Sequence, residues 1–369
     1  MKAGSGAAGH YEPRQVRKEA AVNSSPGRCW VAWLEQAGSR KPSSLGSTIG
    51  ARPRFFLMLE PEKLPRKSES NEHSPRPQSL LSQTKQLLRQ SGLRARKGLG
   101  QHFLIDGGIL HSIVSAADLA PSDIVLEVGP GLGVLTRALA EQAGWVVAVE
   151  LDSKLAAILK QTLSSFDNVS IVEGDILKID PAALLESQRQ VLPPAITDPS
   201  SYKVVADLPY YITSHVLRHF LEAQAKPRLM VLMVQKEVAQ SIVAKPGDMS
   251  MLSVSVQFYG KPSIIRYVPA RSFYPAPNVD SAILRVDLYS KPVVNVTDNQ
   301  SFFDVVRAGF CAARKQIANS LAQGLKLSKA EVLPLLEKAG IESKRRAETL
   351  TIEEWARLWR ELSKVREEA

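Results

Sequence analysis

The chain has little cysteine and histidine and lacks any long apolar run. Its 369 residues include two cysteines, Cys29 and Cys311, and six histidines. Because there is no CxxC pair and no histidine at a metal-ligand spacing, neither a disulfide framework nor a zinc site is supported, and a reducing compartment is expected. No apolar stretch reaches the roughly 18 residues that a membrane-spanning helix requires. The sequence therefore predicts a protein that does not cross a membrane and binds no metal.

Positive charge is in excess, but it is unevenly distributed. The formal net charge is +10, which invites a nucleic-acid interpretation because basic surface attracts phosphate. Residues 1–90 hold 15 Lys and Arg against 7 Asp and Glu, whereas residues 91–369 hold 32 against 30. A nucleic acid bound by the later part must therefore use local clusters, unless each cluster is only a solvated surface. The candidate clusters are Arg94, Arg96 and Lys97, then Arg314 and Lys315, then Lys344, Arg345 and Arg346.

Residues 1–90 are predicted to be a disordered basic N-terminal extension. They are rich in Gly, Ser, Pro, Arg and Lys and have only brief apolar stretches, so they cannot bury enough apolar area to offset chain entropy. Three origins stay open: an organellar transit peptide, a basic tail, or upstream sequence included by a start site placed too early. Glu12 and Glu19 weaken the first, since transit peptides avoid acids.

The rest of the chain divides into a sheet-forming part and a helical part. From about residue 121, short β-branched segments alternate with helical ones, which predicts an α/β fold with a parallel sheet covered by helices. Beyond residue 290 the apolar spacing is that of helices. We expect domains at 91–290 and 291–369. The predicted strands are 124–128, 145–149, 169–172, 203–206, 229–234, 263–268 and 282–286. The predicted helices are 132–142, 153–163, 214–224, 236–244, 302–310, 317–325, 331–338 and 352–362.

A glycine-rich turn, 127–133 (EVGPGLG), follows the first predicted strand. Gly129 and Gly131 let the backbone approach a ligand at the strand end, although a structural loop or a dinucleotide site would look similar. Glu150 ends the next strand, where a carboxylate can accept hydrogen bonds from both ribose hydroxyls. Asp175, after the third strand, can accept from an adenine amine, unless it is only a helix cap. One nucleoside without a pyrophosphate favours S-adenosylmethionine over NAD.

A second group of polar and aromatic residues, 207–210 (DLPY), follows the fourth predicted strand. An aromatic amine is a poor nucleophile because its lone pair is delocalised, and acceptors on its protons favour a more reactive nitrogen. The Asp207 side chain and a backbone carbonyl beside Pro209 can be those acceptors, and Tyr210 can stack on a flipped base. This pattern predicts methylation of an amino-bearing base; the alternative is a capped strand end with a core tyrosine.

Taken together, these motifs resemble the ribosomal RNA adenine dimethyltransferases, which modify two adjacent adenosines near the 3' end of small-subunit rRNA. The resemblance covers about residues 93–362. It rests on the glycine turn, Glu150, Asp175 and the 207–210 tetrad. It also rests on 97–104 (KGLGQHFL), 235–238 (QKEV), 273–282 (FYPAPNVDSA), 314–315 (RK) and 346–350 (RAETL).

The resemblance implies a Rossmann-like methyltransferase sheet that uses S-adenosyl-L-methionine, followed by a small all-helical domain that engages RNA. The implied partner is small-subunit rRNA in a pre-ribosomal particle, bound by a monomer in the cytoplasm, or in an organelle if the extension is a transit peptide. Phe273 is implied as a second aromatic wall opposite Tyr210. The implied reacting-site residues are Asp207, Leu208, Pro209, Tyr210 and Phe273, and the cofactor contacts are His102, Leu104, Gly129, Gly131, Glu150, Asp175 and Asp207.

Two positions depart from the family pattern, which usually has Asn in place of both His102 and Asp207. An Asp at the start of the tetrad still accepts hydrogen bonds. Two other functions compete: methylation of a large-subunit rRNA adenine of the macrolide-resistance type, and a non-catalytic assembly or transcription factor. Residues 279–282 (VDSA) and the long helical tail favour the small-subunit group over the first. The intact glycine turn, Glu150 and Asp175 argue against the second.

Overall fold

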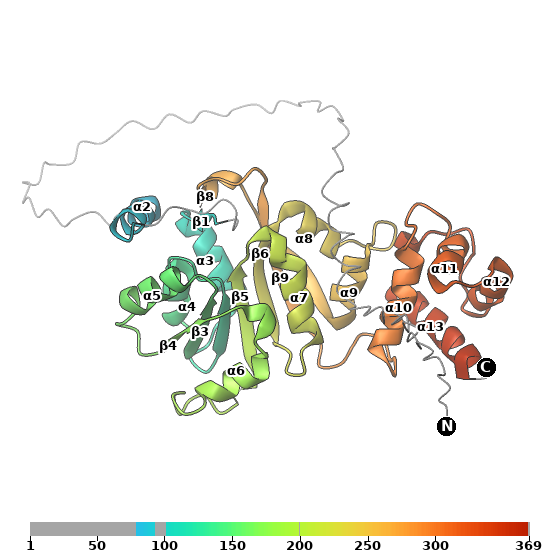
Figure 1. The fold of residues 1–369 in the computed structure, drawn as a ribbon, viewed down its shortest axis with the longest axis horizontal. Coiled ribbons are helices and arrows are strands. Elements are labelled where there is room, and N and C mark those ends of the chain that lie inside the picture. The colour runs from blue at the N-terminus through green and yellow to red at the C-terminus, as the bar shows by residue number, and fades with distance from the viewer. Residues whose placement is uncertain (1–78, 93–100, 199, 368–369) are drawn as a thin grey trace, which may run out of the picture. The chain divides into compact units, whose positions relative to one another are not determined.

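A seven-stranded sheet organises the part of the chain that the structure describes, which is residues 79–92, 101–198 and 200–367 of a computed structural model (Figure 1). The strand order is β4-β3-β2-β5-β6-β9-β7. The first five of these run parallel, β9 pairs antiparallel with β6, and β7 pairs antiparallel with β9. Their bounds are β2 Ile124–Val128, β3 Trp145–Glu150, β4 Val169–Glu173, β5 Tyr202–Asp207, β6 Leu229–Gln235, β7 Gly260–Val268 and β9 Ser281–Leu288. All seven predicted strands are confirmed.

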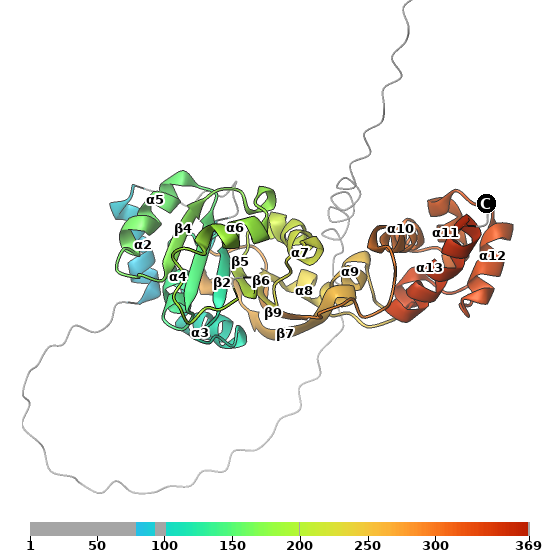
Figure 2. The same cartoon turned by 90° about the horizontal axis from the view of Figure 1, so that it is seen from below.

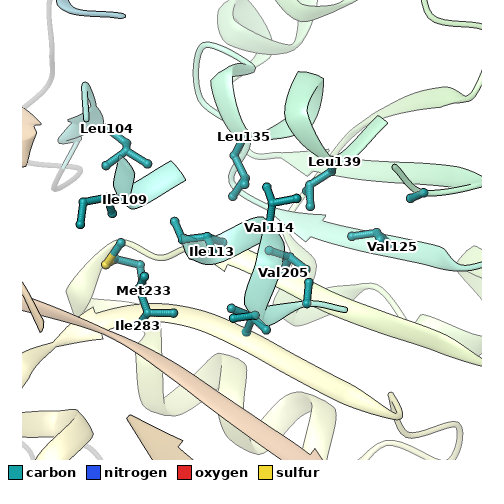
Figure 3. Close-up of a cluster of buried hydrophobic side chains, with 14 of the residues drawn as sticks. Leu104, Ile109, Ile113, Val114, Val125, Leu135, Leu139, Val205, Met233 and Ile283 are labelled. Carbon is teal, nitrogen blue, oxygen red and sulfur yellow. The ribbon is translucent and has the colours of Figure 1, made fainter. Parts of the chain in front are cut away.

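Helices cover both faces of the sheet, as Figures 1 and 2 show. Successive strand residues point to opposite faces of the sheet, so the side chains of Tyr202 and Val205 in β5 contact helices on different faces. Tyr202 packs on Phe220 of α7 (Thr213–Glu222). Val205 lies in the cluster of Figure 3 with side chains of α3 (Gly107–Ala116) and α4 (Val134–Ala140). The remaining helices of the sheet region are α5 Ser153–Thr162, α6 Pro181–Gln188, α8 Lys236–Ile242 and α9 Met251–Tyr259.

The chain ends in a group of helices, as predicted. These are α10 (Asn299–Phe310), α11 (Ile317–Leu325), α12 (Lys329–Lys338) and α13 (Ile352–Glu367). Trp355 of α13 is fully buried, and a Cβ on Gly309 of α10 would lie 2.2 Å from its ring, so close helix packing requires glycine there. Phe258 of α9 stacks on Phe302 of α10 with ring centroids 4.9 Å apart, which joins this group to the sheet region. None of the helices in the described ranges is long and apolar enough to cross a membrane.

The predicted disordered extension is wrong at its C-terminal end, because residues 80–90 form the helix α2 (Leu80–Gln90). The Ser79 hydroxyl accepts a hydrogen bond from the Ser82 N–H and caps it. Leu88 is buried in a small cluster with Phe103, Leu132 and Leu155. A short amphipathic pattern was hidden in the polar average of the long segment. Residues 1–78, for which disorder was predicted, lie outside the described residues.

A two-stranded sheet was also not predicted. In it β1 (Phe103–Leu104) pairs antiparallel with β8 (Phe273–Tyr274), placing Leu104 opposite Phe273. The Ile105 N–H continues the contact by donating to the Ser272 carbonyl at 2.9 Å. Strands of two residues have no periodicity to detect, and their partners are about 170 residues apart. This pairing carries residues 101–105 to the edge where the parallel strands end.

At the other end of these strands a buried ion pair joins Asp123 and Lys203. The Lys203 ammonium lies 2.8 Å from Asp123 Oδ2 and also donates to the carbonyls of Ala117 and Asp118. Arg228 lies 2.5 Å from the other carboxylate oxygen. Burial works to raise the pKa of Asp123, but the hydrogen bond and charge of Lys203, with Arg228, outweigh it and the pKa is lowered. The charges therefore hold the starts of the three strands β2, β5 and β6 together.

We expect Lys203→Met to lower the free energy of unfolding by about 3 kcal/mol, because it leaves a buried carboxylate with one partially exposed partner. Urea unfolding measures the change. Arg189→Met is the matched control, since the Arg189 pair with Glu186 is exposed and its loss should have no measurable effect. Equal losses in the two variants would contradict the account.

Candidate functional site

A cavity of about 430 Å³ opens where β2, β3, β4 and β5 end. Its size suits a nucleoside-sized ligand. Parallel strands end at the same edge of a sheet, and this edge collects ligands in open α/β folds. Every site residue predicted from the sequence lines this one cavity, which supports their grouping and leaves their roles as predictions. They are His102, Leu104, Gly129, Gly131, Glu150, Asp175, Asp207, Leu208, Pro209, Tyr210 and Phe273.

The glycine turn and Glu150 are directly connected. Gly131 adopts φ +59°, a left-handed conformation that side chains disfavour, and its N–H donates to Glu150 Oε2 at 3.1 Å. The Asp152 N–H donates to Oε1 at 2.9 Å. Burial raises the pKa of Glu150 against these hydrogen bonds. The carboxylate is therefore held in one orientation, and each oxygen keeps a second lone pair for a ligand hydroxyl.

Asp175 does cap a helix, as the alternative interpretation stated. It precedes the 3₁₀ helix η2 (Ile176–Lys178), and its Oδ1 accepts from the Leu177 N–H at 3.1 Å. Its Oδ2 lies 3.6 Å from the ammonium of the exposed Lys178. Capping occupies one side of the carboxylate only. Asp175 also lines the cavity, so the cap and a ligand contact are compatible.

The 207–210 tetrad lies on the opposite side of the cavity from Asp175 along the sheet, because β2 and β3 separate β5 from β4. Asp207 ends β5, and burial raises the pKa of its carboxyl to about 7. Tyr210 begins the 3₁₀ helix η3 (Tyr210–Ile212). The carboxyl of Asp207 thus titrates near neutral pH, where an Asn at this position would not.

Two contacts fix the surroundings of Tyr210. Its hydroxyl lies 2.7 Å from the Ser281 hydroxyl. Its ring stacks against His102, with centroids 6.4 Å apart and planes 22° from parallel. His102 Nδ1 lies 2.6 Å from the Pro275 carbonyl oxygen, and a carbonyl can only accept, so Nδ1 carries the hydrogen.

The Phe273 side chain is almost fully buried, whereas a ring that stacks on a base must expose one face to it. It is 3% exposed and belongs to the same buried core cluster as Leu104 and Val205, while also lining the cavity. Its pairing with Leu104 in the β1–β8 sheet fixes it. It can therefore offer a ligand only part of its ring, and its predicted place opposite Tyr210 stays a prediction.

Glu127 is a cavity residue that the sequence interpretation missed. It is 1% exposed, and its Oε2 has no hydrogen-bond partner among the described residues. Burial raises its pKa to about 8; the nearby Thr136 hydroxyl opposes the rise, and repulsion by Glu150 and Asp207 adds to it. The signal was present, because Glu127 lies one residue before the end of β2, beside the glycine turn, and Glu150 and Asp207 end their own strands.

The cavity therefore gathers acids with little compensating charge. Glu127, Glu150, Asp152, Asp175 and Asp207 line it, and among the described residues Lys154 is the one lysine or arginine in its lining. Buried carboxylates repel each other when ionised and gain from a cation brought among them. The site can therefore attract a positively charged nucleoside through its charge as well as through hydrogen bonds.

We expect Glu127→Gln to flatten the dependence of stability on pH. The pKa of Glu127 in the folded chain, about 8, lies above its ordinary 4.5, so its contribution to stability is complete below pH 4.5 and is lost as pH rises through 8. Thermal melting at pH 5.5 and pH 8.5 measures this. The wild-type chain should lose more stability across that range than the variant, with the exposed Glu186→Gln as a control that behaves like wild type. If stability changed with pH to the same extent in Glu127→Gln and Glu186→Gln, the raised pKa of Glu127 would be contradicted.

Comparison with known proteins agrees with the geometry. The model of the family described as "Ribosomal RNA adenine dimethylase" matches residues 92–364. A Dehalococcoides mccartyi protein named "Ribosomal RNA small subunit methyltransferase A" is 54% identical over 280 residues, which cover 76% of this chain and 92% of that protein. A Moorella thermoacetica protein of the same name is 45% identical over 282 residues, covering 75% and 95%.

Solved structures show the same fold. A dimethyladenosine transferase from Plasmodium falciparum matches with a TM-score of 0.59 at 25% identity, covering 71% of this chain and 98% of that one. The 23S rRNA methyltransferase ErmE matches with a TM-score of 0.55 at 30% identity, covering 71% and 99%. The predicted Rossmann-like methyltransferase sheet with a C-terminal helical region is confirmed. With a family model matched over most of its length and relatives above 40% identity, the chain belongs to the ribosomal RNA adenine dimethylase family.

Proposed function

We propose that this chain transfers methyl groups from S-adenosyl-L-methionine to the N6 amines of two adjacent adenosines near the 3' end of small-subunit rRNA. The single observation that carries the chemistry is one cavity that joins a glycine turn, the ribose-acceptor candidate Glu150 and the buried acid Glu127 to the 207–210 tetrad. The 54% identity to a protein named as a small-subunit methyltransferase supports the substrate. That relative is closer in sequence than ErmE, so it favours the small-subunit substrate over the large-subunit one.

The residues present fit S-adenosylmethionine. The cofactor supplies a methyl group already activated as a sulfonium cation. Glu127, with a buried oxygen that lacks a hydrogen-bond partner among the described residues, would supply negative charge for such a ligand as it ionises near its raised pKa of about 8. Glu150, held by the Gly131 N–H, would accept from the ribose hydroxyls, and Asp175 from the adenine amine. His102, Leu104 and Gly129 would complete the wall, since they line the same cavity.

The tetrad would act on the target base. Asp207 and a backbone carbonyl at Pro209 would accept hydrogen bonds from the N6 amine, and Tyr210 would stack on the ring. The amine nitrogen would receive the methyl group that the cofactor supplies, and the amine would then give up a proton. Asp207 can hold that proton, because burial places the pKa of its carboxyl at about 7. Positioning then supplies most of the remaining rate.

The RNA itself would be engaged partly by the helical region. Arg314, Lys315 and Lys344 are exposed there and suit phosphate contacts. Arg345 does not, because its guanidinium is committed to Glu354 and to Thr349. The cluster at 94–97 lies outside the described residues. We place the reaction on a pre-ribosomal particle in the cytoplasm, with the protein acting as a monomer.

The substrate is tested by mapping dimethyladenosine in rRNA from a strain that lacks the gene. We expect the mark to be lost at the adjacent pair in small-subunit RNA and restored by the wild-type chain. Restoration should fail with Asp207→Ala. An unchanged mark there, or loss of a mark in large-subunit RNA instead, would contradict the proposal.

Cofactor and base contacts should separate by mutation. Glu150→Ala removes the proposed ribose acceptors, so we expect the affinity for S-adenosylmethionine to fall about 10- to 100-fold. Tyr210→Ala should leave that affinity within about twofold and lower methyl transfer, because stacking on the base contributes about 1 to 3 kcal/mol. Calorimetric titration with the cofactor measures the first effect. A similar loss of cofactor affinity in both variants would count against this division of roles.

The charge of the cavity should make cofactor binding depend on pH. Glu127 and Asp207 ionise with pKa values of about 8 and 7, so negative charge grows between pH 6 and pH 8.5. The ratio of affinities for S-adenosylmethionine and S-adenosylhomocysteine should rise on the order of tenfold over that range, since only the former carries a sulfonium charge. In Asp207→Asn the rise should be smaller. A constant ratio in the wild-type chain would contradict the electrostatic account.

A further inference from the structure

Ser281 makes one side-chain contact that links the far end of the sheet to the reacting site. Its hydroxyl lies 2.7 Å from the Tyr210 hydroxyl, and either group can donate. Ser281 is fully buried, whereas Tyr210 is half-buried at the cavity. Within the described residues, this is the one hydrogen bond formed by the Ser281 side chain. A buried hydroxyl without a partner is unfavourable, so the pair is held together from the Ser281 side.

The backbone of Ser281 is fixed on both sides. It is the first residue of β9 and lies opposite Gln235 of β6 and Val268 of β7. A residue between two paired strands has little freedom beyond its own rotamer. Ser281 is therefore a rigid anchor, and it is placed where β6 ends beside β5 and Asp207.

Tyr210, in contrast, sits on a weakly held element. It starts the 3₁₀ helix η3, which has no side-chain cap and no buried residue. Apart from Ser281, its ring contacts His102 at a centroid distance of 6.4 Å, which is at the long end for ring stacking. Such a side chain can change the orientation of its ring unless the ring is held at a point away from the backbone. In Tyr210 that point is the hydroxyl, which is bonded to Ser281.

We propose that Ser281 is a positioning residue for the methyl transfer, because it fixes the plane of Tyr210 against which the target adenine stacks. This inference rests on the proposed function, in which Tyr210 contacts the base. Ser281 does not touch the substrate itself. A stacked base tolerates only small changes in ring angle when its amine must meet a methyl group, so loosening the ring lowers the productive fraction of complexes.

A double-mutant cycle tests the proposal on the full chain with undermethylated small subunits. Ser281→Ala and Tyr210→Phe each break the same hydrogen bond, so each should lower kcat/KM about 3- to 10-fold, and the double variant should lose no more than the larger single loss. The affinity for S-adenosylmethionine should change less than twofold. Ser281→Thr keeps the hydroxyl and should retain more activity than Ser281→Ala.

The matched control is Ser255→Ala, which removes another buried serine hydroxyl, bonded within α9 to the Met251 carbonyl at 2.8 Å. It should leave kcat/KM unchanged. Multiplicative losses in the double variant, or a Ser281→Ala variant no worse than Ser255→Ala, would overturn the proposal.

A second readout separates positioning from folding. Burial raises the pKa of the Tyr210 phenol and the hydrogen bond with Ser281 lowers it, so Ser281→Ala should raise that pKa further. Ultraviolet titration, with Tyr210→Phe subtracted, measures it without any substrate. An unchanged titration would refute the contact. If the wild-type chain methylates no small-subunit RNA while the titration shifts as expected, the proposed function fails and the Ser281 contact stands.

Discussion

The structure depends on the parallel alignment of β2, β3, β4 and β5, because it brings a carboxylate from each strand end to one edge. Glu150 ends β3, Asp175 follows the end of β4, and Glu127 is the last residue but one of β2. Asp207 ends β5 on the other side of β2. Burial raises the pKa of Glu127, Glu150 and Asp207, and repulsion by the other two adds to the rise at Glu127. Ionisation of these acids is therefore unfavourable in the empty cavity, and a cationic ligand would stabilise their ionised forms.

The remaining parts of the molecule hold this edge in place. The Asp123–Lys203 pair secures the opposite ends of the same strands. The β1–β8 pairing closes one side of the cavity with segments far apart in the sequence, and Leu88 of α2 packs on Phe103 behind it. Ser281 connects the antiparallel side of the sheet to Tyr210. Distant elements thus converge on a site whose charged groups would otherwise move apart.

Sequence patterns predicted the regular features of this arrangement, which are the strands of the main sheet and the residues at their ends. The central strands β2, β3, β5 and β6 are buried on both faces and show as apolar runs, whereas the outer strands β4 and β7 are only partly buried and were found from their β-branched residues. Acids or glycines at the strand ends marked the cavity. Glu127 was missed because a carboxylate at a strand end does not reveal how deeply it is buried. The β1–β8 pairing and the Tyr210–Ser281 contact were missed because each depends on residues brought together only by folding. The helix α2 was missed because the polar composition of the long N-terminal segment hid its short amphipathic pattern.

A crystal structure of the chain with S-adenosylmethionine tests the central claim most directly. The account predicts the ribose hydroxyls on Glu150, the adenine amine on Asp175, and the sulfonium between Glu127 and Asp207 with its methyl group facing Tyr210. A cofactor bound elsewhere, or bound here with Glu127 and Asp207 turned away from its positive charge, would contradict it.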